Sequence, residues 1–519
     1  MKQIHQINPS HQIMPWALAL LSGCLNGIGF IFVGAFVLFA NVPLLIALST
    51  LKSSSAHQSS SVPKSSVAIK LGAIVGFLGG IHIYGVLNYG WWIFWAFSLY
   101  TASQMMIYAF FFHLLWGKRS SLRYQFYEFF LPAVLWTITE WIRTIGPIAL
   151  PASYVGCMSD LDWFRPWLSW AYHFGGLGVS FLIAICQSLI FSVIHLIISR
   201  FQEDRFQEDR FQENRPKRSW LPIITGFLIL MLSGLWGYLD PIPLKSHDSQ
   251  QPITVGAVQV GFSNLNYQAS AMDPLIAQEI VRSIAKRLQE AYAQKISIVF
   301  LAETVLRGPL LEEESYYSQI FPKADQKTTL IAGFLKKDNK GKMYNLAIAV
   351  EKGQVVDQYA KVRPVPGTES NIIAGQSWQA LDTQFAKVAI LICFESIYPQ
   401  AGRAVNEDHP ALMAVLSNDA GFGYSPISKH MNNRSIERAV ESGKWLVRIG
   451  QSGVSAIISP RGEITKQLDL FESANLYGEV FLKTEKSPFI RLGLWWLPLL
   501  FIFLIIGLLV KKNTPISQI

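Results

Sequence analysis

The sequence predicts a polytopic α-helical membrane protein with an α/β domain inserted before its last membrane span. Three observations support this fold class. Of the 519 residues, 51% are hydrophobic and only 15% are charged, whereas soluble globular domains carry about 25% charged residues. Apolar runs of about 20 residues, the length that crosses a bilayer, gather at the two ends of the chain. Between them, the region 250–485 has the short β-rich runs and charged helical segments of a soluble domain.

About seven apolar runs precede the soluble region, and one follows it. Asn41 and Pro43 interrupt the apolar stretch that holds the first two runs. A cleaved signal peptide over residues 1–30 is the alternative for the first run, and it is disfavoured because several further spans follow. The predicted spans are 15–32, 34–51, 70–89, 92–116, 128–146, 174–198, 220–238 and 491–510.

The distribution of Lys and Arg predicts the orientation in the membrane. The odd-numbered loops are almost free of them apart from Arg143 and Arg165. By the positive-inside rule, the even-numbered loops and both termini are therefore cytoplasmic, and the soluble domain lies on the opposite side. This placement also excludes nucleic acid as the partner of the net charge of +9. The basic residues concerned are Lys52, Lys64, Lys70, Lys118, Arg119, Arg123, Arg200, Arg205, Arg210, Arg215, Lys217, Arg218, Lys511 and Lys512.

Three regions follow from these signals: a membrane domain over 1–240, a soluble domain over 241–488, and a last span with a short tail over 489–519. Within the first region, 201–215 repeats the unit FQEDR, FQEDR, FQENR. A binding element is one interpretation of this repeat. A solvated low-complexity linker is favoured, because its charges nearly cancel and a five-residue unit forms no packed structure.

In the soluble region, near-continuous apolar strands alternate with helices. This pattern predicts a buried sheet covered by helices, in an α/β or layered α+β domain with its own core. The expected helices cover 272–294 and 428–444. The expected strands are 253–260, 297–303, 328–334, 345–351, 387–395 and 411–419.

Cys393 is the first candidate for chemistry, because it ends the apolar run VAILI at an expected strand terminus. The other cysteines, Cys24, Cys157 and Cys186, lie in or beside membrane spans. A lone cysteine is commonly a small buried hydrophobic residue. Strand ends in helix-covered sheets are where sites collect, however. Glu395 follows two residues later, on the same side if the strand continues.

Three charged residues complete a candidate set with this cysteine. Glu303 ends another apolar strand, and Lys361 and Glu369 lie in the stretch YAKVRPVPGTE. Each alone is compatible with an ordinary surface charge. Together with Cys393 they suit nucleophilic catalysis, in which a thiolate attacks a carbonyl, a carboxylate moves protons and an ammonium stabilises the oxyanion. The spacing does not identify the carbonyl.

These segments resemble a known family. FLAE at 300–303, Lys361 before PVPGTE, and ICFES around Cys393 resemble the Glu-Lys-Cys triad of the nitrilase (carbon–nitrogen hydrolase) superfamily, whose fold is an αββα sandwich. In combination with the spans, the chain resembles the apolipoprotein N-acyltransferase branch of that superfamily. Further similar segments are SNDA (417–420), a helix carrying Arg434 and Arg438, SGVSAIISPRGEI (452–464), GCLNGIGF (23–30), EWIR (140–143) and GLGVSFL (176–182).

The resemblance implies a role for each residue. Cys393 is expected to be the nucleophile that carries an acyl thioester, Glu303 the general base, and Lys361 the oxyanion stabiliser. Glu369 and Glu395 are expected to hold Lys361 and the thiol in place, and Asn418 matches the family's asparagine.

The implied reaction is a ping-pong transfer. An acyl chain moves from a phospholipid to the thiol, and then to the N-terminal amine of diacylglyceryl-cysteine in an apolipoprotein. The implied setting is a bacterial inner membrane, with the catalytic domain in the periplasm and the protein a monomer. No spaced His/Cys cluster predicts a metal, and no motif predicts a cofactor.

Three positions depart from the family's pattern. The loop reads PVPGTE where the family has approximately LVPFGE, Gly421 stands where a tryptophan usually follows SNDA, and Ala152 stands where another tryptophan is expected. These changes fall in parts expected to meet lipid rather than in the triad. They bear on the gating loop and the acyl preference.

Two other functions fit parts of the sequence. A membrane-tethered amidase that hydrolyses a carbon–nitrogen bond would use the same residues, with water as the acceptor. A transporter or channel has little support, because the spans carry few ionisable groups. Glu140 and Arg143 are expected to pair at the outer surface. The histidines His82, His173 and His195 lie in or beside the spans.

Overall fold

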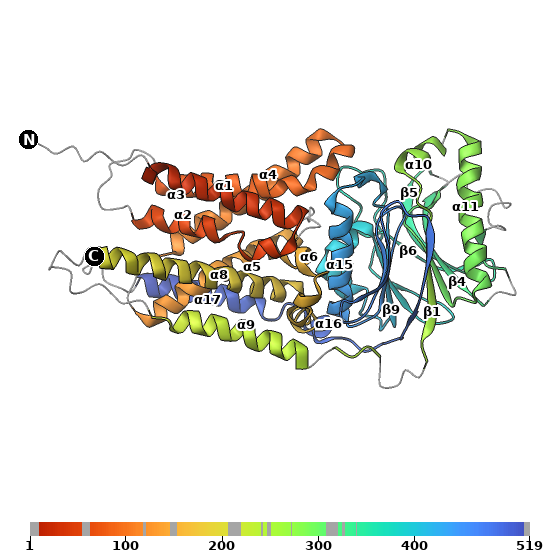
Figure 1. Ribbon diagram of the computed structural model, residues 1–519. Helices are drawn as coiled ribbons and strands as arrows, with labels where there is room; N and C mark the ends of the chain where they lie inside the picture. Colours follow the sequence, from red (N-terminus) through yellow and green to blue (C-terminus); the bar gives the residue numbers. More distant parts are fainter. Residues whose placement is uncertain are drawn as a thin grey trace, which may run out of the picture.

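The computed structural model describes two parts, a bundle of long helices and a sandwich of two sheets, packed end to end (Figure 1). It describes residues 10–53, 63–117, 121–145, 153–205, 219–239, 242–245, 251–270, 272–307, 320–323, 327–338 and 340–512. Ala152 and residues 206–215 of the repeat lie outside these ranges.

The bundle holds the N-terminal helices together with the last helix of the chain, so both ends of the sequence meet in it (Figure 1). Its elements are α1 (Ser10–Ile31), η1 (Gly34–Leu38), α2 (Val42–Ser53), α3 (Lys64–Gly79), η3 (Gly80–Asn88), α4 (Trp91–Leu115), α5 (Leu122–Ile145), α6 (Tyr154–Met158), η4 (Asp162–Phe164), α7 (Arg165–Leu168), α8 (Ala171–Arg205), α9 (Leu221–Leu239), α16 (Pro488–Leu492) and α17 (Leu497–Lys512).

The chain is a membrane protein with several apolar helices. Among the described residues, five helical segments are long and apolar enough to cross a bilayer: Ile13–Ile31, Gly34–Leu51, Lys64–Asn88, Ala171–Phe201 and Leu221–Leu239. They match five of the predicted spans.

The other three predicted spans differ from this group. Helices α4 and α5 coincide with 92–116 and 128–146 and are 25 and 24 residues long, but they fall outside the five. The run 491–510 is divided, because Gly493, with φ at +61°, ends α16 before α17 begins. The apolar part of α17, Leu497–Leu509, is shorter than the five spans.

The sandwich contains both predicted helices and all six predicted strands, with several further short elements. They are β1 (Ile253–Gln259), α10 (Asn264–Ser270), α11 (Pro274–Ala293), β2 (Ile298–Leu301), β3 (Leu306–Arg307), β4 (Thr329–Lys337), β5 (Met343–Glu351), β6 (Gln354–Ala360), β7 (Ala380–Leu381), β8 (Val388–Ile392), η5 (Cys393–Ile397), α14 (Pro399–Ala404), β9 (Leu412–Ser417), η6 (Ala420–Phe422), α15 (Pro426–Ser442), β10 (Leu446–Gly450), β11 (Ser455–Ile458), β12 (Ile464–Leu468) and β13 (Ala474–Val480).

Two sheets face each other inside this domain. One has seven strands in the order β13-β1-β2-β4-β5-β6, with β3 beside β4, and the other has six in the order β12-β11-β10-β9-β8-β7. The central pairs β1–β2, β2–β4, β8–β9 and β9–β10 are parallel. Helix α11 covers the outer sheet and α15 covers the sheet nearer the bundle (Figure 1). This confirms the α/β sandwich that the sequence predicts.

One predicted strand boundary is wrong. The strand expected over 387–395 ends at Ile392, and Cys393 begins the 3-10 helix η5. Cys393 and Glu395 therefore do not share a strand face. The reason is local, because the Glu395 carboxylate accepts a hydrogen bond from the backbone N–H of Ile392 at 2.8 Å and turns the chain back at this point.

The face of α15 toward the bundle carries four buried charged side chains that neutralise one another. A lone buried charge is strongly destabilising, so each of these requires its partner. The shortest ion pairs are Arg434 Nη1 to Glu437 Oε2 at 2.5 Å, Arg438 Nη2 to Glu437 Oε1 at 2.6 Å, and Arg438 Nη1 to Glu441 Oε2 at 2.9 Å.

This charged face is joined to the bundle at a break in α8. Gly175 adopts φ of +71° inside that helix, which frees the backbone N–H of Gly176. That N–H donates to Glu441 Oε1 at 2.8 Å. The sandwich is thus bonded to a membrane helix through buried polar groups, which fixes the orientation of the two parts.

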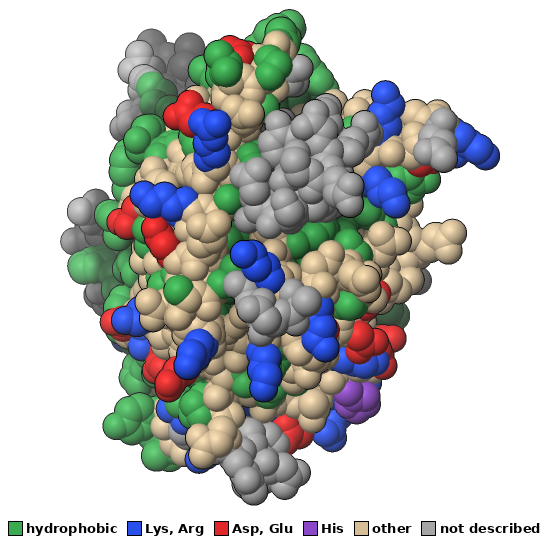
Figure 2. All heavy atoms as spheres, turned by 90° about the vertical axis from the view of Figure 1, so that its right-hand side faces the viewer, with side chains coloured by type: hydrophobic (Ala, Val, Ile, Leu, Met, Phe, Trp, Pro, Cys, Tyr) green, Lys and Arg blue, Asp and Glu red, His purple; other side chains and the backbone are tan. Residues whose placement is uncertain are grey.

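The end of the sandwich remote from the bundle carries many charged side chains on its surface (Figure 2). Figure 2 shows Lys, Arg, Asp and Glu side chains scattered over this face among polar groups. The contrast with the apolar flanks of the bundle agrees with one part in lipid and the other in water.

We expect Gly176→Ala to destabilise the junction by about 1–3 kcal/mol, as overpacked sites do. A Cβ at this position would lie 1.9 Å from Glu437 Oε1, and two arginines hold that carboxylate in place. The measurement is the thermal unfolding temperature in detergent. Gly27→Ala is the control, since its nearest neighbour would lie at 3.3 Å. Equal transitions for both variants would contradict this account.

Candidate active site

The carboxyl ends of three parallel strands bring the predicted site residues together. Glu303 follows β2, Cys393 follows β8, and Asn418 follows β9, while Lys361 comes directly after β6. Parallel strands expose their carboxyl ends along one sheet edge, which is where polar groups can gather without disrupting the core. All four residues line one cavity.

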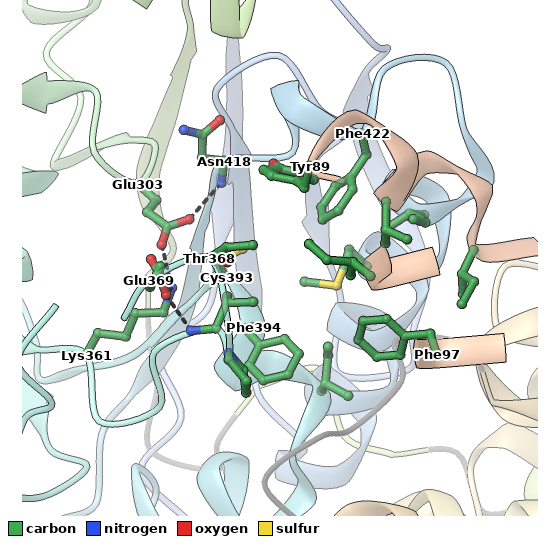
Figure 3. Close-up of a pocket in the computed structure, with 18 of the residues that line it drawn as sticks. Tyr89, Phe97, Glu303, Lys361, Thr368, Glu369, Cys393, Phe394, Asn418 and Phe422 are labelled. Atoms are coloured by element: carbon green, nitrogen blue, oxygen red, sulfur yellow. Dashed lines mark hydrogen bonds and ion pairs between the residues drawn. The ribbon is translucent and has the colours of Figure 1, made fainter. Parts of the chain in front are cut away.

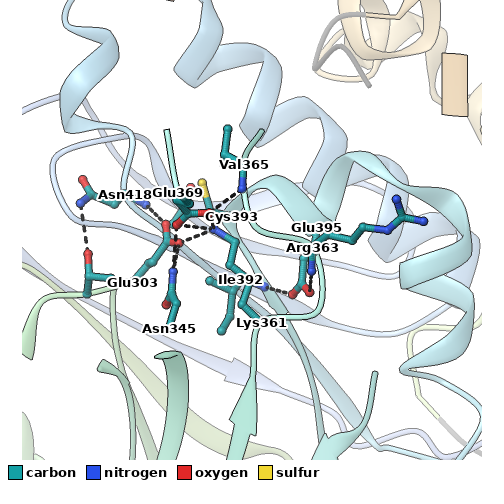
Figure 4. A network of polar contacts seen from close by, with 12 residues as sticks. Glu303, Asn345, Lys361, Arg363, Val365, Glu369, Ile392, Cys393, Glu395 and Asn418 are labelled. Atoms are coloured by element: carbon teal, nitrogen blue, oxygen red, sulfur yellow. Dashed lines mark hydrogen bonds and ion pairs between the residues drawn. The ribbon is translucent and has the colours of Figure 1, made fainter. Parts of the chain in front are cut away.

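A buried ion pair lies at the centre of this site. Lys361 is 1% exposed, and its Nζ lies 2.8 Å from Glu303 Oε1 and 2.9 Å from Glu369 Oε2 (Figure 4). Burial by itself lowers the pKa of Lys361, but the charges of the two carboxylates outweigh it and hold that pKa above its ordinary value. The ammonium is therefore a permanent cation at neutral pH.

Each carboxylate has further donors that fix its orientation. Asn345 Nδ2 donates to Glu303 Oε1 at 2.8 Å and to Glu369 Oε1 at 3.2 Å. The backbone N–H of Asn418 donates to Glu303 Oε2 at 3.0 Å, which links the two sheets. The N–H of Val365 donates to Glu369 Oε2 at 2.6 Å. These contacts leave Glu303 little freedom to turn away from the site.

Cys393 lies at a strained backbone position beside this pair. Its φ is +49°, a left-handed value that non-glycine residues rarely adopt and that collects at functional sites. The side chain is 7% exposed. Burial and the negative charge of Glu303 raise the pKa of the thiol, although Lys361 lowers it in part. The resting sulfur is thus a protonated thiol that requires a base.

Glu395 acts on the backbone rather than on reacting groups. Its fully buried carboxylate accepts from Tyr359 Oη at 2.7 Å, from the N–H groups of Val362 and Arg363 at 2.7 and 3.2 Å, and from the N–H of Ile392. The N–H groups of Val362 and Arg363 directly follow Lys361 in the chain. The N–H of Ile392 directly precedes Cys393. Glu395 therefore ties together the two segments that carry them.

The cavity beside the thiol has a volume of about 240 Å³ and two unlike walls. The sandwich supplies the polar groups of the lining, Glu303, Lys361, Glu369, Cys393 and Asn418, together with apolar side chains of its own. The bundle supplies the other wall, which is almost wholly apolar, and Figure 3 shows Tyr89 and Phe97 of that wall facing the catalytic groups. Its residues are Ile83, Val86, Tyr89, Ile93 and Phe97.

Sequence analysis did not single out Asn345, Tyr359 or the bundle wall. Tyr359 carries a signal in retrospect, because it lies two residues before Lys361 on the same strand face. Asn345 lies beside Lys361 only through the pairing of β5 with β6, in which Leu346 is opposite Ala360. The bundle wall has no local signal, since its residues come from the end of one predicted membrane span and the start of the next.

No group of three or more His, Cys, Asp or Glu side chains in the described ranges could hold a metal ion.

Known proteins resemble the chain at two levels. The family model for carbon-nitrogen hydrolases matches residues 277–487. These residues hold every candidate site residue. Residues 277–487 form a carbon-nitrogen hydrolase domain.

Similarity to named proteins extends beyond the carbon-nitrogen hydrolase domain into the bundle. The apolipoprotein N-acyltransferase of Azotobacter vinelandii is 27% identical over 441 residues, which cover 74% of this chain and 78% of that protein. The enzyme of the same name from Pseudomonas putida is 24% identical over 480 residues, covering 81% and 84%. The chain is thus homologous to apolipoprotein N-acyltransferases over most of its length. A solved nitrilase-superfamily protein from Saccharomyces cerevisiae aligns with 46% of this chain and 93% of its own, at 19% identity and a TM-score of 0.37.

The geometry of the carbon-nitrogen hydrolase domain suits acyl transfer through a covalent intermediate. The thiol of Cys393, the carboxylate of Glu303 and the cation of Lys361 line one cavity. The carboxylate can take the thiol proton, and the cation can stabilise the negative charge that develops on an attacked carbonyl oxygen.

We expect Glu395→Gln to lower the free energy of unfolding by about 1–3 kcal/mol, because the new amide nitrogen would face donors and leave at least one buried N–H or O–H unpaired. Thermal unfolding in detergent measures this loss. Glu407→Gln, on the exposed surface, is the matched control. A Glu395→Gln variant as stable as the control would show that these contacts do not hold the site together.

The raised pKa of the Cys393 thiol predicts the pH dependence of its alkylation. Because the thiolate fraction grows tenfold per pH unit below the pKa, the rate with iodoacetamide should rise about tenfold per unit between about pH 6 and pH 9. The experiment uses a chain in which Cys24, Cys157 and Cys186 are replaced by serine, so that only one thiol reacts. A rate that is independent of pH below pH 7 would reveal a stored thiolate instead.

Proposed function

We propose that the protein transfers an acyl chain from a phospholipid to the N-terminal amine of diacylglyceryl-cysteine in an apolipoprotein, through a thioester on Cys393. The homology to apolipoprotein N-acyltransferases over most of the chain supports this function. The observation that carries it is the cavity in which the triad residues of the sandwich face an apolar wall from the membrane bundle. A small soluble amide needs no such wall, whereas an acyl chain does.

In the first half-reaction, Glu303 takes the thiol proton of Cys393 and the sulfur attacks the ester carbonyl of the phospholipid. Lys361 stabilises the tetrahedral oxyanion. The C–O bond to the glycerol then breaks, and Glu303 returns the proton to the departing alkoxide, which leaves as a lysophospholipid. The thioester remains on the sulfur.

In the second half-reaction, the amine of the diacylated lipoprotein attacks the thioester carbonyl. Glu303 accepts a proton from the nitrogen, the C–S bond breaks, and the proton returns to the sulfur. The amide product leaves with the thiol restored. Glu369, Glu395 and Asn418 are positioning residues. Glu369 pairs with the ammonium of Lys361. Glu395 holds the backbone next to Lys361, and Asn418 holds the carboxylate of Glu303.

Several wider features belong to the same proposal. The five apolar segments, together with α4, α5 and α17, make about eight spans, with both termini in the cytoplasm and the sandwich in the periplasm of a bacterial inner membrane. The chain then consists of a membrane domain over 1–240, the catalytic domain over 241–488, and a last span with a short tail over 489–519. The Lys and Arg distribution supports this orientation. The protein acts as a monomer, without metal or cofactor.

The test is an assay with detergent-solubilised protein, a phospholipid with a labelled acyl chain and a diacylated lipopeptide. We expect triacylated product from the wild type and a loss of at least about 10³-fold in Cys393→Ala. Lys361→Met should lose about 10²–10³-fold, the range for removal of an oxyanion donor. Lys387→Met, a change of the same type at a partly exposed surface ion pair, should keep full activity.

The family match keeps one other function open to the same test, hydrolysis of a carbon–nitrogen bond with water as the acceptor. A wild-type protein that forms no triacylated product but releases ammonia or an amine from a small amide would be such an amidase. Mass spectrometry of an acyl thioester on Cys393 after incubation with phospholipid alone separates the two functions directly.

A further inference from the structure

A turn of the membrane bundle enters the catalytic site from outside the sandwich. It lies between η3 and α4, at Asn88 to Trp92, and it contacts two loops of the sandwich. Asn88 Nδ2 donates to the carbonyl oxygen of Gly421 at 3.0 Å. On the other loop, a Cβ at Gly367 would lie 3.2 Å from Trp92. The turn is thus held between the loop that follows Asn418 and the loop that carries Glu369.

Tyr89 is the residue of this turn that reaches the catalytic groups. Its ring lies against Phe422, with centroids 5.3 Å apart, and beside Asn418 in Figure 3. Its hydroxyl occupies the space next to residue 421, since a Cβ there would lie 1.9 Å from Tyr89 Oη. Gly421 therefore gives the ring room to reach the site.

The position of Tyr89 is at the boundary between the cavity and its surroundings. Its ring lines the same cavity as Cys393, yet the residue is 39% exposed. Of the five bundle residues that line the cavity, it is the one with a polar atom; the others are aliphatic or phenyl side chains. An aromatic ring that lines the cavity of Cys393 and is itself partly exposed is suited to keep water away from whatever the thiol carries.

We propose that Tyr89 is a specificity-determining residue that shields the thioester on Cys393 from water and so favours transfer over hydrolysis. This inference rests on the proposed function, because it concerns the fate of the acyl intermediate. In the reaction to be suppressed, water oxygen adds to the thioester carbonyl, the C–S bond breaks, a free fatty acid leaves, and a water proton returns to the sulfur through Glu303. Exclusion of bulk water is how closed sites prevent such loss of reactive intermediates.

A shield against water is required because the residues that form the thioester could also hydrolyse it. The catalytic residues belong to a carbon-nitrogen hydrolase domain, and the carboxylate that activates the thiol can equally activate water. A transferase with two large substrates must keep its intermediate until the second substrate arrives. The turn of the bundle adds Tyr89 to the lining of the cavity that holds the thiol of Cys393.

The experiment is a single-turnover measurement on the full chain in detergent. The enzyme is loaded from a phospholipid with a labelled acyl chain, the donor is removed, and the thioester is followed with and without a diacylated lipopeptide. Without the acceptor, we expect Tyr89→Ala to lose its thioester as free fatty acid at least about tenfold faster than the wild type. Tyr89→Phe should stay within about twofold, because the ring remains.

Tyr84 provides the matched control. It belongs to the same bundle segment, and its hydroxyl donates to the carbonyl oxygen of Tyr424 at 3.3 Å, but it does not line the cavity. Tyr84→Ala removes an equal ring from the same junction and should keep the wild-type decay rate. Gly421→Ala should accelerate hydrolysis about 3–10-fold, because its new methyl group displaces the ring.

Loading of the thioester confirms in each variant that the site is folded. Equal decay of Tyr89→Ala and wild type would overturn the inference, as would equal acceleration by Tyr84→Ala, which would indicate loosened docking instead. A wild-type protein that forms no thioester overturns the proposed function itself, and the shield with it.

Discussion

The buried ammonium of Lys361 is the constraint around which the site is built. A lone cation in this position would be strongly destabilising, so it needs carboxylates in direct contact. Glu303 comes from the sheet remote from the bundle, and its second oxygen is bonded to the backbone of Asn418 in the other sheet. Glu303 therefore joins the two halves of the sandwich, through its ion pair with Lys361 in one sheet and its hydrogen bond from Asn418 in the other. The same pairing that stabilises the fold therefore places the cation of Lys361 and the carboxylate of Glu303 at fixed positions near Cys393.

Burial disfavours the charged form of both Cys393 and Lys361, but neighbouring carboxylates reverse the outcome for Lys361. It keeps the thiol of Cys393 protonated, which protects a nucleophile that meets lipid, while the paired carboxylates keep Lys361 charged. In the proposed mechanism, the thiol becomes the attacking group when Glu303 takes its proton. The carbon-nitrogen hydrolase domain supplies this chemistry, and the bundle supplies the apolar wall that decides which carbonyl can approach.

The sequence alone predicts the strands and the polar residues that follow them, because apolar runs and a following polar residue are local signals. It wrongly places Glu395 on the same strand face as Cys393. The Glu395 carboxylate instead accepts hydrogen bonds from the nearby N–H of Ile392 and from Tyr359, Val362 and Arg363 on another segment, and the strand ends at Ile392. The sequence alone misses Asn345, whose place beside Lys361 depends on the register of two antiparallel strands. Register is set by packing and turn geometry over the whole hairpin, which no single residue encodes.

Gly421 shows why a departure from a family pattern requires the folded structure for its interpretation. From the sequence alone, Gly421 in place of a tryptophan removes a large side chain from a loop that is expected to contact lipid. In the fold, the space beside residue 421 is filled by Tyr89, which comes from a turn more than 300 residues earlier in the chain. No side chain can be added at 421 while that ring is in place. The loop of the sandwich and the turn of the bundle therefore constrain each other sterically, and the wall above Cys393 is a property of both domains together.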